Sequence, residues 1–180
     1  VNIENYILSL KGKVSSCITI LRFATAFGLS SRMRYDLTVN EFTRDIFNST
    51  KLEVYDPDTW RPYCHVKDFA NILLLILDTE KKKVSFEVFN AGSDENNQTK
   101  RMIVEKILKF INFNEVYFVN NKGSDPRNYR VNFKKLNSVL GYKCKYLVED
   151  GIKEIIAHLQ KSNKNNSKSI EALGNYIINR

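Results

Sequence analysis

Glycine and long apolar runs are scarce in this 180-residue sequence, and each shortage excludes a class of protein. The seven glycines include no Gly-x-x-Gly-x-x-Gly sequence, which excludes an intact Gly-rich dinucleotide-binding turn in this chain. The longest apolar run, residues 72–77, is far shorter than the roughly 18 residues of a membrane-spanning helix. No basic region followed by an apolar stretch opens the chain, so we expect no signal peptide and a cytoplasmic protein.

Cysteine and histidine are also few. Cys17, Cys64 and Cys144 are odd in number and far apart, which predicts neither a disulfide framework nor a metal site. Cys17 and Cys64 lie in apolar, strand-like segments, so both are predicted to be buried free thiols. His65 and His158 have no second metal ligand nearby in the sequence, and we interpret both as structural residues.

The charge balance is basic, with a net charge of +8 at pH 7. Such a balance is compatible with polyanionic partners. The excess lysines are nevertheless scattered, apart from residues 81–83 and 161–168, and they do not alternate with aromatic residues as in a single-strand binding platform. The pattern therefore disfavours nucleic acid and leaves a small phosphate-bearing ligand, which needs far fewer charges.

Hydrophobic periodicity predicts alternating helices and strands, as in an α/β protein. Helices are expected at about 1–12, 37–47, 68–77, 99–110, 133–140, 148–160 and 170–178. Strands are expected at 17–23, 52–55, 61–66, 86–92 and 116–119, with an exposed connection at 81–83 and a polar turn at 122–127. The strand at 17–23 is almost wholly apolar, which is typical of a parallel sheet covered on both faces. Because no strand and Gly-rich turn come first, we interpret the chain as the end of an α/β protein.

Several charged residues are candidates for binding phosphate. Arg61 precedes a proline and is expected on a rigid turn, where its guanidinium could make a bidentate contact. Arg127 ends a second turn of sequence Asp-Pro-Arg. Asp36 is expected to be the N-cap of the helix at 37–47. On the residues alone, the alternative that all of these are ordinary surface charges and caps stays open.

Five segments stand in a consistent order along the chain. They are ITILRFATAFG (18–28), SRMRYDLTVNEF (31–42), WRPYCHVKDFA (60–70), FEVFNAGS (86–93) and SDPRNYRVNFKKLNSVLGYK (124–143), the last followed by LVEDGIKEII (147–156). In this order they resemble the extended short-chain dehydrogenase/reductase family, in its NAD-dependent nucleotide-sugar epimerase/dehydratase branch. The resemblance covers about residues 4–159.

The resemblance implies the C-terminal portion of an extended Rossmann-type α/β fold, with late strands of the parallel sheet and the smaller α/β substrate-binding domain. Residues 1–30 would end the dinucleotide-binding domain. Residues 31–160 would form mainly the substrate-binding domain, with the strand at 86–91 returning to the main sheet. Residues 161–180 would form a polar linker and a terminal helix.

The resemblance also implies roles for individual residues. Those implied to bind substrate are Thr25, Asp36, Leu37, Asn40, Arg61, Asp125 and Arg127, and those implied to lie near the nicotinamide ring are Phe23 and Ala24. Arg61 would contact the substrate phosphates, and Leu37 would act through its backbone. Thr25 and Asp36 replace asparagines that are common in some branches of the family.

The implied activity is an NAD-dependent epimerisation or dehydration of a nucleotide-diphosphate sugar, with NADP as the other cofactor that such folds use. The family's catalytic Tyr-x-x-x-Lys pair is missing after Tyr6, where Leu10 stands in place of lysine. We therefore predict no catalytic residue in this chain and no activity of the chain alone. A homodimer, which many relatives form through a helix bundle that includes the first helix, is compatible with the resemblance.

Three alternatives remain on the sequence. The first is a non-catalytic nucleotide-binding or regulatory module of the same ancestry, which would keep Arg61 and Arg127 as well. The second is an NADPH-dependent reductase of the same fold, which only the first βαβ unit would distinguish. The third is a basic nucleic-acid-binding fragment, whose binding would depend steeply on salt.

Overall fold

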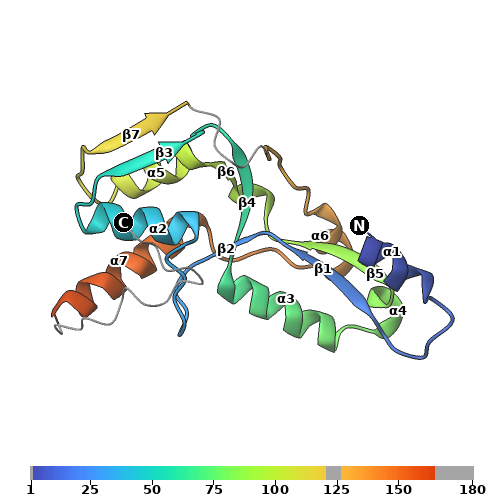
Figure 1. Cartoon of the computed structure of the whole chain (residues 1–180). Coiled ribbons are helices and arrows are strands. Elements are labelled where there is room, and N and C mark those ends of the chain that lie inside the picture. Colours follow the sequence, from blue (N-terminus) through green and yellow to red (C-terminus); the bar gives the residue numbers. More distant parts are fainter. Residues whose placement is uncertain (1, 121–126, 165–180) are drawn as a thin grey trace.

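The computed structural model describes residues 2–120 and 127–164 (Figure 1). The turn expected at 122–127 lies almost wholly outside the described residues, and the terminal helix expected at 170–178 lies entirely outside them. The helices are α1 (Asn2–Ser9), α2 (Thr38–Phe47), α3 (Val66–Asp78), α4 (Lys81–Val84), η1 (Asp94–Asn96), α5 (Lys100–Leu108), α6 (Lys134–Leu140) and α7 (Val148–Lys164). The strands are β1 (Thr19–Phe23), β2 (Thr25–Phe27), β3 (Leu52–Tyr55), β4 (Trp60–His65), β5 (Glu87–Ala91), β6 (Asn97–Thr99) and β7 (Val116–Val119).

In the part of the chain that the structure describes, the strands form three small sheets, and β4 is the middle strand of the three-stranded one. β1 pairs with β5 and β3 with β7, both in parallel. β4 pairs in parallel with β2 along its second half and antiparallel with β6 along its first half. In Figure 1, β4 runs between the group of β3, β7, α2, α5 and α7 and the group of β1, β5, α3, α4 and α6. It therefore joins the two halves of the molecule.

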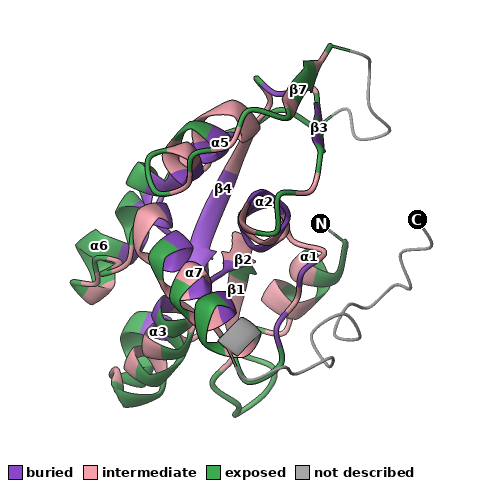
Figure 2. Cartoon of the chain, turned by 90° about the vertical axis from the view of Figure 1, so that its left-hand side faces the viewer, coloured by how far each residue is buried: buried purple, intermediate pink, exposed green. Residues whose placement is uncertain are grey.

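Two main apolar clusters correspond to these two groups. The larger joins side chains of β2, β3, β4, α2, α5 and α7, and the second joins α3, α4, β5 and α6. Figure 2 shows β4 as the most continuously buried strand. Its last four residues, Pro62 to His65, are all buried. Because side chains of a strand alternate between its faces, β4 contributes to packing on both sides.

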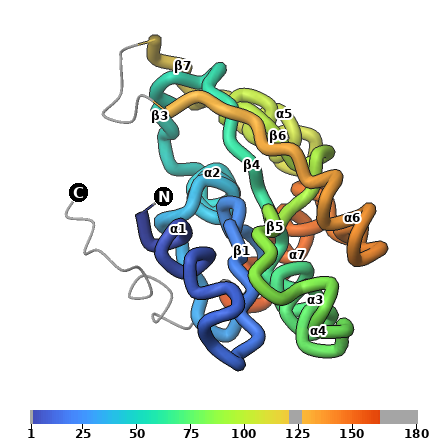
Figure 3. The backbone as a smooth tube through the Cα atoms, turned by 90° about the vertical axis from the view of Figure 1, so that its right-hand side faces the viewer, coloured from blue at the N-terminus to red at the C-terminus, as the bar shows by residue number. Residues whose placement is uncertain are grey.

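The predicted alternation of helices and strands is confirmed, and the strands at 52–55 and 116–119 begin and end where expected. The prediction that the strand at 17–23 is covered on both faces is wrong. Arg22 and Phe23 are exposed and the rest of β1 is half-buried. Among the described residues β1 pairs only with β5, and the neighbouring helix α1 buries none of its own residues (Figure 3).

Two smaller expectations are also wrong, and a third is confirmed only in part. Residues 81–83 are exposed as predicted, but they belong to a short helix whose last residue, Val84, packs in the second cluster. Cys17 is exposed, since it lies before the first paired residue of β1, whereas Cys64 is buried as predicted. Asp36 is not the N-cap of α2; that position is Leu37, with extended backbone and no side-chain capping bond.

Candidate functional site

The carboxyl end of β1 leads directly into β2, and this passage lies where β5 also ends. Ala24, between the two strands, donates its N–H to the Ala91 carbonyl at 3.1 Å. Phe23 is 48% exposed and packs edge-on against Phe69, with ring centroids 4.6 Å apart. Thr25 begins β2 and lies opposite Tyr63 of β4. In open α/β sheets, ligands bind beyond the carboxyl ends of parallel strands, so this is the expected place for a site.

The segment before α2 carries two more of the predicted residues. Arg34 donates from Nε to the Asp36 carboxylate at 3.0 Å, and this hydrogen bond holds the pKa of Asp36 below its usual range. Leu37 follows with extended backbone at φ −104° and ψ 133°. The Asp36 side chain therefore pairs with a neighbouring arginine instead of the helix N-terminus.

Asn40 is 2% exposed and ties two loops together. Its amide nitrogen donates to the Arg34 carbonyl at 3.0 Å, and its amide oxygen accepts from the Gly28 N–H at 3.1 Å. Residues 34–40 are thereby fixed to the end of β2. The structure gives Asn40 a positioning role, and its predicted contact with substrate stays a prediction.

Arg61 lies on strand β4, which confirms the strand predicted at 61–66; the turn predicted from its neighbouring proline is wrong. The Arg61 backbone is opposite Gln98 of β6. Pro62, the next residue, is the last residue of β4 that pairs with β6, and the following residues pair with β2. The guanidinium donates from Nη1 to the Trp60 carbonyl at 2.8 Å and lies 5.5 Å from the centre of the Tyr129 ring. The rigidity expected for Arg61 is present, but strand pairing supplies it.

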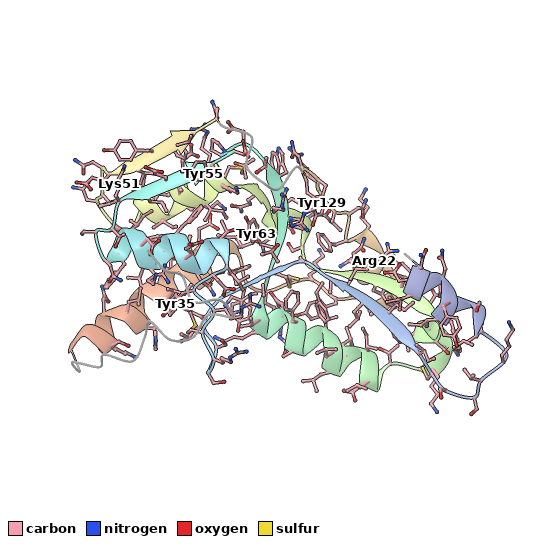
Figure 4. All side chains as sticks on the ribbon, viewed as in Figure 1. Arg22, Tyr35, Lys51, Tyr55, Tyr63 and Tyr129 are labelled. Carbon is pink, nitrogen blue, oxygen red and sulfur yellow. The ribbon has the colours of Figure 1, made fainter. Side chains whose placement is uncertain are left out.

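Residues 127–132 fold back over the start of β4, although they follow it by more than 60 positions. Trp60 donates its N–H to the Asn128 side chain at 2.9 Å and accepts the Tyr129 N–H at 3.3 Å. The Arg130 guanidinium lies 3.4 Å from the centre of the Trp60 ring. Arg127 is exposed, and Asp125 lies outside the described residues. Figure 4 shows Tyr129 beside the upper end of β4.

Sequence reasoning singled out Arg61 and Arg127 and missed three further residues of this cluster. Trp60, Tyr129 and Arg130 form it together with Arg61. An open surface pocket of about 470 Å³ adjoins Trp60 and Arg130 and is also lined by Asp94, Asn97, Val131 and Asn132. The available signal was the Asn-Tyr-Arg run directly after Arg127. Its significance could not be judged without knowing that it lies against β4.

Tyr63 and Lys67 are the only Tyr-x-x-x-Lys spacing in the sequence. They do not share a helix, because Tyr63 belongs to β4 and Lys67 to α3. Burial raises the pKa of Tyr63 to about 12, and Lys67 forms an ion pair with Glu154. This pair is therefore not arranged like the helical catalytic pair of the family.

His65, the neighbour of these residues, makes contacts that hold the fold together, and its lack of a catalytic role stays a prediction. It is fully buried, and its Nδ1 accepts the Lys67 N–H at 3.2 Å, which caps α3. Its Nε2 lies 3.0 Å from a Glu154 carboxylate oxygen. The ring also stacks on Tyr146 with centroids 4.5 Å apart. Within residues 2–120 and 127–164 no cluster of three metal-ligating side chains occurs, and no helix is long and apolar enough to cross a membrane.

The alternation of strands and helices, with β1 and β5 paired in parallel, defines an α/β protein. The chain belongs to the NAD dependent epimerase/dehydratase family, whose model matches residues 2–92. It is also 28% identical, over 136 residues, to an uncharacterized protein of Methanocaldococcus jannaschii; the match covers 74% of this chain and 40% of that protein.

Solved structures of the same fold include two sugar-nucleotide enzymes. A UDP-glucose 4-epimerase of Thermotoga maritima, solved with UDP-glucose, matches with a TM-score of 0.76 at 21% identity, over 90% of this chain and 52% of that one. A dTDP-glucose 4,6-dehydratase of Bacillus anthracis, solved with NAD, matches with a TM-score of 0.73 at 21% identity, over 89% and 50%. The chain thus spans about half the length of these relatives.

Proposed function

We propose that this chain is the C-terminal, substrate-binding portion of an NAD-dependent nucleotide-sugar epimerase or dehydratase. Its family membership and its match to half of such enzymes support the proposal. The observation that carries it is the contact of Arg61 with Tyr129, which brings residues 127–132 against β4 beside the strand ends. Two arginine-bearing segments far apart in the sequence thereby meet at one place, and arginine side chains are well suited to binding phosphate groups.

In this proposal Arg61 binds the diphosphate of the nucleotide sugar, and Asp125 and Arg127 belong to a turn that binds the ribose or the phosphates of the nucleotide. Residues Asp36, Leu37 and Asn40 line the nucleotide, and Leu37 offers its backbone. A hydrogen bond to the Trp60 carbonyl and the contact with the Tyr129 ring already hold the Arg61 side chain, so little side-chain freedom is lost on binding. The Thermotoga maritima epimerase was solved with UDP-glucose, and a UDP-glucuronic acid 4-epimerase of Bacillus cereus of the same fold was solved with UDP-glucuronic acid, which supports a substrate of this class.

The described residues would supply only part of an NAD-binding site. Phe23 presents a half-exposed ring at the carboxyl end of β1, and Ala24 is small enough for close approach, so both suit one edge of a nicotinamide. Thr25 would lie next to the sugar. The chemistry that NAD or NADP supplies when bound is the transient oxidation of a sugar carbon, whereas this chain contributes binding and orientation.

The test is nucleotide binding by the full 180-residue chain, measured by isothermal titration calorimetry with UDP and UDP-glucose. Arg61→Gln should weaken binding by about 10-fold or more, since a charge-assisted hydrogen bond contributes roughly 1.5–3 kcal/mol. Lys51→Gln is the control, because it removes a charge from an exposed ion pair on β3, far from Tyr129 in Figure 4. Equal affinity of both variants and the parent chain would rule the assigned phosphate contact out.

The same preparation tests whether the chain binds substrate without catalysing its conversion. The purified chain is expected to show no turnover of UDP-glucose in the presence of NAD, followed by product chromatography. Binding without turnover would support a substrate-binding portion. It would equally suit a non-catalytic module of the same ancestry, which an added dinucleotide-binding half would fail to activate. Turnover by the chain alone would contradict the assignment of catalysis to residues that this chain lacks.

A further inference from the structure

Strand β6, which lies beside β4, belongs to a run of four polar residues, 96–99 (Figure 1). In three of them the side-chain oxygen accepts a backbone N–H at 3.0 to 3.2 Å: Asn96, Asn97 and Thr99. Gln98 differs. It is 2% exposed and its Nε2 donates to the Glu95 carbonyl at 3.3 Å, but its Oε1 has no hydrogen-bond partner among the described residues. Because buried acceptors are costly to leave unpaired, an exception of this kind indicates a partner that is gained in another state.

The unpaired oxygen belongs to the side chain that faces Arg61. Gln98 is directly opposite Arg61 in the antiparallel register of β4 and β6. Side chains of directly opposite residues lie on the same face of a sheet, with Cβ atoms about 4.5–5.5 Å apart. Neighbouring residues alternate between faces, so Trp60 and Asn97 point the other way, where both line the open pocket of about 470 Å³. The Arg61 side chain is long enough to reach its opposite neighbour.

The Arg61 guanidinium is turned toward the start of β4 instead. Its Nη1 donates to the Trp60 carbonyl at 2.8 Å, and it lies 5.5 Å from the centre of the Tyr129 ring. A guanidinium has five N–H groups in a planar fork, so rotation of the side chain can exchange one acceptor for another. Gln98 offers a fixed acceptor for such a rotation, because its own amide is already held by the Glu95 carbonyl.

We propose that Gln98 is a positioning residue for Arg61 in the nucleotide-bound chain. In that state one N–H of the guanidinium donates to Gln98 Oε1, and the N–H groups on its other side face the diphosphate. This inference rests on the proposed function, since it takes Arg61 as the residue that binds the diphosphate. The acceptor is buried and held before the ligand arrives, so Arg61 gains a fixed orientation without the ordering of a second side chain.

A double-mutant cycle tests whether Gln98 acts through Arg61. The affinity of the full chain for UDP is measured by isothermal titration calorimetry for the parent, Gln98→Met, Arg61→Gln and the double variant. Methionine is similar in shape but its sulfur is only a weak acceptor, so Gln98→Met should weaken binding by about 10-fold. In the Arg61→Gln background the same change should weaken binding by less than about 2-fold. Gln160→Met is the matched control, because Gln160 is exposed on α7.

The melting temperatures of these variants separate a positioning role from a purely structural one. Gln98→Met removes a buried unpaired acceptor, so its melting temperature should lie within about 3 °C of the parent value or above it, while its affinity falls. A structural residue would lose stability and affinity together. Equal losses of affinity in the two Arg61 backgrounds would overturn the proposal, because Gln98 would then act without Arg61.

A measurement on the parent chain does not depend on how the variants fold. Gln98 and Gln160 are the two glutamines of the sequence, so isotope-labelled glutamine gives one side-chain carbonyl signal from each by NMR. Addition of UDP should shift the Gln98 signal in the direction of a newly accepted hydrogen bond and leave the Gln160 signal in place. Saturation with UDP and no shift at Gln98 would overturn this inference alone. Absence of UDP binding by the parent chain would overturn the proposed function with it.

Discussion

Gly28 has no side chain, and this leaves room for the buried ring of His65. Its backbone has a φ of +101°, and an added Cβ would lie 2.2 Å from Nε2 of His65. Backbone strain and overlap with a buried ring therefore act together at this position. The neighbouring Asn40 also binds the Gly28 N–H, so any shift would disturb residues 34–40.

Gly28→Ala should consequently destabilise the protein by roughly 3 kcal/mol or more, measured by urea unfolding. Gly12→Ala is the matched control, since Gly12 also has a positive φ of +77° but no atom lies within 4 Å of the added Cβ. The control should lose only about 1 kcal/mol, the cost of backbone strain. Similar losses in the two variants would show that the His65 ring yields easily.

His65 is held neutral by its surroundings. Its Nδ1 accepts the Lys67 N–H, so the proton is on Nε2 and points to Glu154. Burial lowers the pKa of His65 below its ordinary value of 6.5, and the Glu154 carboxylate offsets this only in part. Lys67 and Asp68 also face the ring with opposite charges. Protonation of Nδ1 would place its N–H against the N–H of Lys67, and two donors cannot form a hydrogen bond with each other.

Stability should therefore fall as the pH drops below about 6.5. In that range the unfolded chain takes up a proton on His65 that the folded chain does not, and each such proton changes the free energy of unfolding by up to about 1.4 kcal/mol per pH unit. Urea unfolding at pH 7.5, 6.5 and 5.5 measures the slope. His65→Gln should flatten it and His158→Gln should not. A His65 imidazole that titrates above 6.5 by NMR would contradict this account, and it can be observed even if the Gln variant fails to fold.

At the scale of elements, Asp68 joins α3 to the segment before α7. Its carboxylate accepts three hydrogen bonds, from Tyr142, Lys145 and Tyr146, and it is fully buried. An amide at this position would turn one acceptor oxygen into a donor that faces another donor. The unsatisfied groups would remain buried, which costs about 1–3 kcal/mol each.

Asp68→Asn should thus lower the free energy of unfolding by roughly 2–4 kcal/mol in urea titrations. Asp78→Asn, at the exposed end of the same helix, makes the same chemical change and should stay within about 0.5 kcal/mol of the parent. If the two variants were equally stable, water would have to replace the bonds that Asp68 makes.

The two shortest strands could not be predicted from the local sequence pattern. β2 and β6 are not among the strands predicted from the sequence, because TAF is too short to show alternation and NQT is polar. β6 forms since Asn97 bonds both backbone groups of Val131 and its strand pairs with the start of β4. Those partners are set by tertiary structure, whereas longer strands such as β3 carry their own alternating signal.

At the scale of the whole molecule, one helix face remains apolar and exposed. Leu73, Leu74 and Leu77 of α3 are 45%, 59% and 79% exposed, while Ile72 of the same helix is fully buried. Exposed apolar surface of this kind promotes association. The chain is therefore expected to self-associate as its concentration rises.

The double variant Leu74→Gln/Leu77→Gln should lower the weight-average mass in sedimentation velocity and leave the melting temperature nearly unchanged. Ile72→Gln provides the contrast, since it places an amide in the second apolar cluster and should lower the melting temperature strongly. An unchanged mass distribution in the double variant would show that another surface drives association.

The sequence by itself determined the family, the α/β class and most elements, because periodicity and ordered motifs are local properties. It also identified Arg61, whose predicted role remains to be tested. Only the tertiary structure decided which strands pair with the one that carries Arg61, and that Trp60, Tyr129 and Arg130 gather around it. The contacts with Tyr129 and Arg130 join residues about 70 positions apart, and such pairings depend on how sheets and helices pack rather than on any neighbouring residue.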